Sequence, residues 1–390
     1  MTSHTTRSLA LVALSHFTIE LSNNFLPVVY PLLISSLGLS YAQVGVVAFV
    51  GGVGTSLTQP VFGYFSDRWY PQLIVILSVA WTGTIMSLVG LAWSFAALLL
   101  VVALGALGSA AFHPSGATIA AISARSRRGA AVSIFSVGGN LGAALSPLWI
   151  TAWIGWLGMR GTVILLPVVL GISLVLYVLM GKGGRSGIHR KLDRQTTAGG
   201  WYTVGLVLIV VAMLFRAWFQ VSLMTYLPAW VQDQGGSLAA GGNMLFVLLA
   251  CVGAGSLMGG ALSDRVGRWQ VLVLSLALLG PAEWFFLGSS GLVQIALLGT
   301  MGALLGATFP VSIVLAQEVW PRGLGVASGL VMGLPWIGGG VGAWFTGVLA
   351  DRFSLTVALQ SLALPAILAA ASMLAYAALQ QPRIGAHSRP

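Results

Sequence analysis

Long apolar runs separated by short polar loops dominate the chain. A helix that crosses a bilayer needs roughly 20 mostly apolar residues, because the hydrocarbon core is about 30 Å thick. By this measure the sequence predicts twelve spanning helices, at residues 8–37, 41–65, 71–93, 95–122, 129–157, 162–180, 201–231, 241–262, 269–289, 291–317, 324–349 and 355–379. The first run continues to Leu37 and contains Glu20, whereas the apolar part of a cleaved signal peptide is about 7–15 residues long. We therefore expect the first run to be a retained span.

Composition agrees with the apolar pattern. Hydrophobic residues make up 57% and charged residues 7% of the 390 residues, whereas soluble domains are roughly 25% charged. A soluble globule cannot bury so much apolar surface, and the same composition excludes a disordered chain. The expected fold class is an all-α integral membrane protein. With Cys251 as the single cysteine, an intramolecular disulfide framework is impossible.

Positive charge is concentrated in alternate loops. The net charge of +10 raises the question of a nucleic-acid partner. We exclude one, because the basic residues lie in short loops between apolar runs and carry topology information instead. If the N-terminus is cytoplasmic, fifteen of the eighteen Lys and Arg residues are inside, two are outside and Arg216 lies within a span. Since cytoplasmic loops are enriched in Lys and Arg, we expect both termini in the cytoplasm.

A basic, glycine-rich stretch divides the chain into two halves. It covers residues 181–200 between the sixth and seventh apolar runs. We expect a six-helix bundle at residues 1–180, a cytoplasmic linker at 181–200, and a second six-helix bundle with a short cytoplasmic tail at 201–390.

The two halves repeat each other. A shift of 197 residues places Pro31 on Pro228 and Phe112 on Phe309. Two similar six-helix halves indicate pseudo-symmetric repeats that enclose a site near the membrane midplane.

A Gly-x-x-x-Asp-Arg motif ends the second run and recurs, at the same shift, at the end of the eighth. Its residues are Gly63, Asp67 and Arg68 in the first copy and Gly260, Asp264 and Arg265 in the second. The glycine lets a neighbouring helix approach closely. Asp67 can face the cytoplasmic N-terminus of the eleventh run and Asp264 that of the fifth, where the helix dipole favours an anion. We expect a conformational latch; the alternative is a plain inside loop with a turn.

This duplicated motif resembles the loop motif of the major facilitator superfamily. Further elements resemble its fosmidomycin-resistance branch: Gln-Pro at 59–60, Ala-Phe-His-Pro-Ser-Gly-Ala at 111–117, Gly-Gly-Asn-Leu-Gly at 138–142, and His16 and Glu20 before Asn24 and Pro27. The resemblance implies a proton-driven exporter of small drugs or metabolites in a bacterial-type inner (plasma) membrane. We expect a monomer that needs no cofactor and no metal.

The first span carries a polar stripe. His16, Glu20, Asn23 and Pro27 fall on one helix face by their spacing, with Asn24 beside them. A charged group at a span centre costs about 2.5–3.5 kcal/mol or more, so it is usually retained for function. Glu20 is a candidate proton carrier and His16 a candidate relay, while Asn23 and Asn24 are candidate substrate contacts. The alternative is a structural Glu–His pair that holds the span to a neighbour.

Polar residues within three other spans are further candidates. His113 precedes the helix-bending Pro114 and is a candidate for proton transfer or substrate binding, unless it only satisfies the loosened backbone. Arg216 and Gln220, one turn apart in the seventh run, are candidate substrate contacts. Arg216 stays charged and needs an anion, which is Glu20 across the cavity, a substrate carboxylate or phosphonate, or a permanent ion-pair partner. For Glu283 we expect an interfacial or packing role rather than one in transport.

The leading functional hypothesis is a proton-coupled antiporter that exports small drugs or organic anions, such as fosmidomycin-like phosphonates, by alternating access. Its expected partners are protons, the lipid bilayer and an anionic or amphipathic small molecule. Proton-coupled symport for uptake of an organic anion is the main alternative, and a non-transporting sensor is a lesser one. A membrane enzyme is disfavoured, because Cys251 lacks a local base and no serine has a nucleophile-elbow setting. No Cys, His or carboxylate cluster has metal-ligand spacing.

Overall fold

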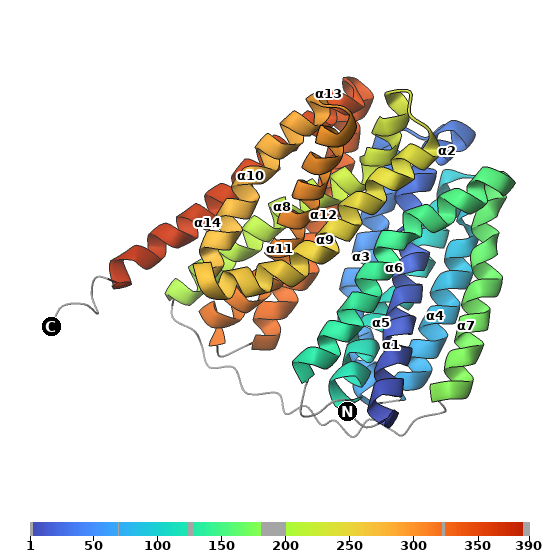
Figure 1. Ribbon diagram of the computed structural model, residues 1–390, viewed down its shortest axis with the longest axis horizontal. Coiled ribbons are helices and arrows are strands. Elements are labelled where there is room, and N and C mark those ends of the chain that lie inside the picture. Colours follow the sequence, from blue (N-terminus) through green and yellow to red (C-terminus); the bar gives the residue numbers. More distant parts are fainter. Residues whose placement is uncertain (1–2, 69, 124–127, 181–199, 322–323, 385–390) are drawn as a thin grey trace. The chain divides into compact units, whose positions relative to one another are not determined.

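The computed structural model describes residues 3–68, 70–123, 128–180, 200–321 and 324–384. These residues are nearly all helical, and no strand occurs among them (Figure 1). The long helices of the N-terminal half are α1 (Ser3–Asn23), α2 (Leu26–Leu37), α3 (Tyr41–Arg68), α4 (Pro71–Ser87), α5 (Phe95–Ser123), α6 (Arg128–Leu157) and α7 (Leu165–Met180). Those of the C-terminal half are α8 (Gly200–Asp233), α9 (Leu238–Val266), α10 (Arg268–Gly288), α11 (Gly291–Val319), α12 (Leu324–Arg352), α13 (Leu355–Gln360) and α14 (Ala363–Ile384).

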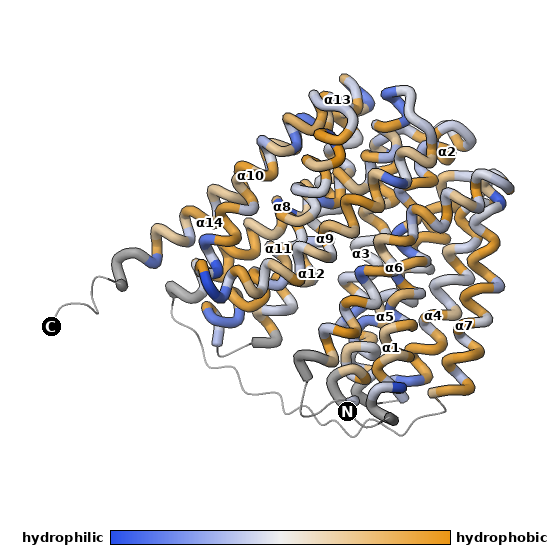
Figure 2. The backbone as a smooth tube through the Cα atoms, in the orientation of Figure 1, coloured by the Kyte–Doolittle hydropathy of each residue, from blue (hydrophilic) through white to orange (hydrophobic). Residues whose placement is uncertain are grey.

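These helices account for the twelve predicted spans. The described residues contain 11 segments that are long and apolar enough to cross a membrane, and one of them, Ala131–Met180, is 50 residues long. It contains both α6 and α7, which the 3-10 turn Gly158–Ile164 separates. The first span is broken into α1 and α2 and the last into α13 and α14. Hydrophobic positions dominate nearly every helix (Figure 2).

The chain forms two compact units. The first comprises Met1–Arg190 and Leu227–Ala250, and the second comprises Lys191–Tyr226 and Cys251–Pro390. The end of α8 and the first part of α9 therefore belong to the first unit. Residues 181–199 of the expected linker lie outside the described residues.

In the first unit, α6 lies directly against α1. A Cβ atom at Gly138 would overlap the carbonyl oxygen of Ala13, and one at Gly142 would overlap that of Phe17. Side chains at these positions would keep the two helices apart, so the glycines permit a close approach of α6 to α1. The contact brings α6 beside the polar stripe of α1.

Glycines have the same effect in the second unit. A Cβ atom at Gly255 or Gly259 of α9 would overlap α11 at Ala303 or Ala307. At Gly342 of α12 it would overlap the side chain of Trp218 on α8. Glycine runs thus bring α8 against α12 and α9 against α11 within this unit.

Candidate functional site

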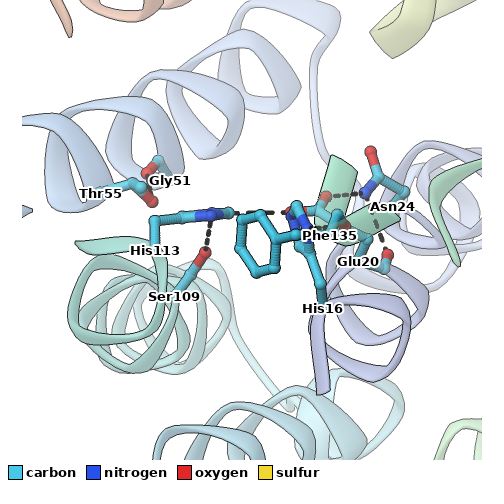
Figure 3. A network of polar contacts seen from close by, with 8 residues as sticks. All are labelled: His16, Glu20, Asn24, Gly51, Thr55, Ser109, His113 and Phe135. Carbon is cyan, nitrogen blue, oxygen red and sulfur yellow. Dashed lines mark hydrogen bonds and ion pairs between the residues drawn. The ribbon is translucent and has the colours of Figure 1, made fainter. Parts of the chain in front are cut away.

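Three ionisable side chains from two helices meet inside the first unit. His16 and Glu20 lie one turn apart on α1, and His113 projects toward them from α5 (Figure 3). The Nε2 atoms of His16 and His113 each lie 3.6 Å from Oε1 of Glu20. The side chains are 13%, 27% and 20% exposed for His16, His113 and Glu20. One carboxylate oxygen therefore faces two imidazoles in a largely buried setting.

Hydrogen bonds fix the orientation of each group. Asn24 Nδ2 donates to Oε2 of Glu20 at 2.7 Å and to the backbone oxygen of Glu20 at 3.0 Å. His16 Nδ1 lies 2.8 Å from the carbonyl oxygen of Phe135. Because a carbonyl oxygen only accepts, Nδ1 of His16 carries a proton and Nε2 is left to face Glu20. His113 Nε2 also lies 3.3 Å from Oγ of Ser109.

Aromatic packing holds the His16 ring in place. The ring stacks on Phe135 of α6 with centroids 4.1 Å apart and planes inclined by 22°. The ring centroid of Phe112 on α5 lies 5.5 Å from that of His16. A Cβ atom at Gly139 of α6 would overlap the imidazole. The space that holds His16 thus exists because residue 139 has no side chain.

The structure gathers four of the five candidates predicted in the first half. His16, Glu20, Asn24 and His113 form one network. Asn23 is the last residue of α1, and its side chain has no hydrogen bond to any described residue. The sequence showed the pairing of His16 with Glu20 through their spacing. It gave no sign of Ser109 or of the Phe135 carbonyl, because each contact depends on how separate helices pack.

Arg216 of α8 is buried in the second unit, with 5% of its surface exposed. Its Nε donates to Oγ1 of Thr308 at 2.6 Å, and its Nη2 donates to the carbonyl oxygen of Leu305 at 2.8 Å. The guanidinium carbon lies 5.8 Å from the ring centroid of Phe309. Among the described residues of this unit, no carboxylate forms an ion pair with Arg216. A permanent ion pair inside the unit, one of the sequence-based alternatives, is therefore absent.

Polar contacts connect α8 to α12 near Arg216. Trp218 Nε1 donates to Oγ1 of Thr346 at 3.0 Å, and Ser222 Oγ lies 3.0 Å from the same atom. Gln220 is buried and points its amide toward the sulfur of Met224, at 3.6 Å. Thr308 and Thr346 were not predicted as site residues from the sequence. Hydroxyl residues within apolar spans were the available signal, but many such residues only bond to their own helix.

The second copy of the loop motif forms a short chain of ion pairs. Arg268 Nη1 lies 3.1 Å from Oδ1 of Asp264, and Arg268 Nε lies 2.6 Å from Oε1 of Glu318. These contacts join the end of α9, the start of α10 and the end of α11. Arg268 and Glu318 were not among the predicted site residues, although Gly267 and Arg268 come shortly after the second motif in the sequence. Arg265 is exposed.

No other helix comes unusually close to either motif glycine among the described residues of its own unit. A Cβ atom at Gly63 would lie 3.8 Å from Cβ of Pro114, an ordinary contact, and one at Gly260 would meet no atom within 4 Å. The expected role of these glycines in a close helix approach stays a prediction. The side chains of Asp67 and Arg68 lie outside the described part of the structure.

Comparison with known proteins places this arrangement in a family. Residues 12–332 match the sequence profile of the Major Facilitator Superfamily, which is more than half of the chain. The chain belongs to this superfamily. It is therefore a multi-pass membrane transporter and not an enzyme, as the sequence analysis predicted.

Individual superfamily members are similar to it along most of its length. The fosmidomycin resistance protein of Escherichia coli K12 is 29% identical over 354 residues, which cover 89% of this chain and 87% of that protein. The 3-(3-hydroxy-phenyl)propionate transporter of the same organism is 27% identical over 242 residues, covering 58% of this chain and 57% of that protein. The fold is similar to the crystal structure of a bacterial homolog of the human lysosomal transporter Spinster in an inward-facing, occupied conformation. The TM-score is 0.80, with 18% identity and coverage of 97% of this chain and 98% of that chain.

Proposed function

We propose that this superfamily member is a proton-coupled antiporter that exports small drugs or organic anions. The observation that carries the proposal is Oε1 of Glu20, which lies 3.6 Å from the imidazoles of both His16 and His113 within apolar helices. A carboxylate inside a membrane-spanning bundle marks a proton or substrate pathway by default. Similarity to a fosmidomycin resistance protein supports export and suggests phosphonates as test substrates.

The network assigns a separate task to each oxygen of Glu20. Asn24 occupies Oε2 at 2.7 Å, so Oε1 is the atom that exchanges a proton. The two distances of 3.6 Å are slightly longer than a hydrogen bond, and a small side-chain rotation would close them. A proton can then move between Glu20 and either histidine without leaving the cluster. Replacement of Glu20 removes the exchange, whereas a merely structural pair would survive an isosteric change.

Arg216 is the proposed anchor for an anionic substrate, with Gln220, Asn23 and Asn24 as further contacts. A guanidinium has five N–H donors, and Thr308 and Leu305 take one each. The remaining donors lie on the two terminal nitrogens, which match the paired oxygens of a carboxylate or phosphonate. The lack of a carboxylate partner for Arg216 within its described unit supports this role.

The test is transport by purified protein in sealed liposomes that contain a pH dye. Fosmidomycin is added under an imposed pH gradient. For one proton exchanged per substrate, a gradient of one pH unit supplies about 1.4 kcal/mol, or a tenfold concentration ratio. We expect wild-type protein to approach this ratio, with protons moving against the substrate.

Glu20→Gln keeps an oxygen that can accept from Asn24 but cannot carry the proton. We expect substrate exchange that no longer responds to the pH gradient. Glu283→Gln is the control, since Glu283 is a fully buried carboxyl on α10 outside the network. If Glu20→Gln accumulates substrate as the wild type does, Glu20 is not the coupling group.

Uptake by proton symport is the second candidate. Similarity to a transporter of 3-(3-hydroxy-phenyl)propionate, an organic acid, favours it. Membrane vesicles of known orientation separate the two directions. Protons and substrate that move the same way would establish symport and exclude antiport.

Three further proposals concern topology, assembly and gating. Both termini are cytoplasmic in a bacterial inner membrane, because fifteen of eighteen Lys and Arg residues are then inside. The transporter works as a monomer of two six-helix halves. The two loop motifs act as a conformational latch, and the ion pairs of Arg268 with Asp264 and Glu318 support this for the second copy. Labelling of cysteines introduced near each terminus tests the orientation.

A further inference from the structure

The network on α1 and α5 has a second chemical property. His16, Glu20 and His113 offer one ligand atom each, and these three atoms all lie within 4.8 Å of one another. No such cluster was visible in the sequence, because 93 residues separate Glu20 from His113 and only the helix packing brings them together. Two imidazoles with one carboxylate are a recognised donor set for transition metals.

The distances suit a metal ion. Bonds of about 2.0–2.2 Å to nitrogen and oxygen in a tetrahedral site place neighbouring ligand atoms roughly 3.4 Å apart. The two measured separations of 3.6 Å between histidine nitrogens and Oε1 of Glu20 are close to this value. The two histidine nitrogens, within 4.8 Å of each other, need to approach by no more than about 1.4 Å to complete the geometry.

Surrounding hydrogen bonds already orient the donors as a metal requires. Nδ1 of His16 donates to the Phe135 carbonyl at 2.8 Å, so its Nε2 presents a lone pair toward Glu20. Metal-bound histidines usually donate their other ring nitrogen to a carbonyl or carboxylate in this way. Asn24 holds Oε2 of Glu20, which leaves Oε1 for the ion. Without a proton or a metal between Nε2 of His16 and Oε1 of Glu20, the lone pairs of these two atoms would face each other.

Charge and donor type indicate which ion fits. Among the described residues, no Lys or Arg forms an ion pair with Glu20, and the nitrogens nearest to its Oε1 belong to the two histidines. A divalent cation would therefore meet no competing cation. Imidazole donors favour zinc, copper, iron and nickel, whereas magnesium and calcium prefer six or more oxygen ligands. Three protein ligands leave one tetrahedral position open for water or another small donor.

We propose that His16, Glu20 and His113 form a binding site for a divalent transition-metal ion of the zinc type. The proposal that the metal ion binds rests only on the distances and hydrogen bonds of His16, Glu20 and His113. Its consequence rests on the proposed function: a bound ion occupies Oε1 of Glu20, the atom assigned to the proton, so zinc blocks proton-coupled transport.

The test uses purified protein without a histidine tag, in lipid nanodiscs, titrated with Zn²⁺ by calorimetry. His4, His189 and His387 are replaced by Gln to remove the remaining histidines of the chain. We expect one Zn²⁺ per protein, with no comparable binding of Mg²⁺ or Ca²⁺. X-ray absorption of the zinc-loaded protein should show two imidazole ligands and one carboxylate, with bonds of about 2.0–2.2 Å.

Single substitutions His16→Gln, Glu20→Gln and His113→Gln should each weaken Zn²⁺ binding. The loss should exceed the roughly 10–100-fold caused by removing a group that only supports a metal ligand. Glu283→Gln, which removes a carboxyl elsewhere, should leave the affinity unchanged. An affinity that none of the three substitutions alters, or a zinc spectrum without two imidazoles, overturns the proposal. The spectrum of the protein with all three ligands intact decides the matter even if a variant fails to fold.

The binding experiments measure no transport, so the two proposals fail separately. Zinc bound by the three ligands in a protein that moves no protons would refute only the coupling function. Proton-coupled transport that zinc does not affect, in a protein that binds no zinc, would refute only the metal site.

Discussion

Substitution of Arg216 by Gln gives the sharpest test of the proposal that this residue binds an anionic substrate. The guanidinium uses two N–H donors on Thr308 and Leu305, at 2.6 and 2.8 Å, and the proposal assigns the remaining donors to the substrate. A net hydrogen bond to a charged group contributes about 1.5–3 kcal/mol. Loss of one such bond to a substrate oxygen therefore weakens binding roughly 10–150-fold.

Stability should change less than binding. The substitution Arg216→Gln removes the contacts with Thr308 and Phe309. It also removes a buried charge, whose desolvation is costly. We expect a folded variant with a raised KM for fosmidomycin and a small shift in Tm. Arg216→Lys keeps the charge without the planar fork and should fall between Gln and the wild type.

The assay measures the KM of the transporter for an anionic substrate and for a neutral substrate in the same liposome preparation. Only the anion should respond to Arg216→Gln. Thr308→Val is the matched control, because it removes the acceptor of the Nε hydrogen bond and leaves the charge in place. An unchanged KM for the anion, or an equal rise for both substrates, would refute the role of Arg216 as an anion anchor.

Three further predictions concern stability and gating. Gly142→Ala should destabilise the protein by about 1–3 kcal/mol, because its Cβ would overlap the Phe17 carbonyl. Gly155→Ala on the same helix is the control, since its Cβ would meet no atom within 4 Å. Equal Tm values for the two variants would contradict this prediction. Glu283→Leu should raise Tm, since both carboxyl oxygens of Glu283 lack a hydrogen-bond partner and the residue is 0% exposed. Burial of such an unpaired polar group costs about 1–3 kcal/mol. A lower Tm for the variant would count against this reasoning. Arg268→Gln should lower the free energy of unfolding by no more than about 1 kcal/mol per lost ion pair. If the latch operates, this variant should change transport turnover more than Arg265→Gln does.

The sequence was sufficient for the spans and for contacts within one helix. Apolar runs are local signals, so the positions of the helices could be predicted, including the separate α6 and α7. The pairing of His16 with Glu20 followed from helix spacing alone. The contact between Glu20 and His113 did not, because it depends on how α1 packs against α5.

Helix ends were the other source of error. The predicted stripe put Asn23 beside Glu20, since a continuous helix places the two on one face. The assigned helix α1 ends at Asn23, but the Asn24 N–H still donates to the Glu20 carbonyl oxygen at 3.0 Å. The helical turn therefore continues, and Asn24, four residues after Glu20, bonds to the acid. Arg268 and Glu318 were missed for a similar reason, because their pairing joins three helix ends that are distant in sequence.

The two hydrogen bonds of Asn24 have a mechanical consequence. One reaches the carboxylate of Glu20 and the other its backbone oxygen, at the point where α1 gives way to α2. The amide therefore connects an acid to a joint in the span. If proton exchange displaces that carboxylate, Asn24 would transmit the displacement to the start of α2. Pro31 lies inside α2 and removes one of its helical hydrogen bonds, so a bend of this segment would meet less resistance there.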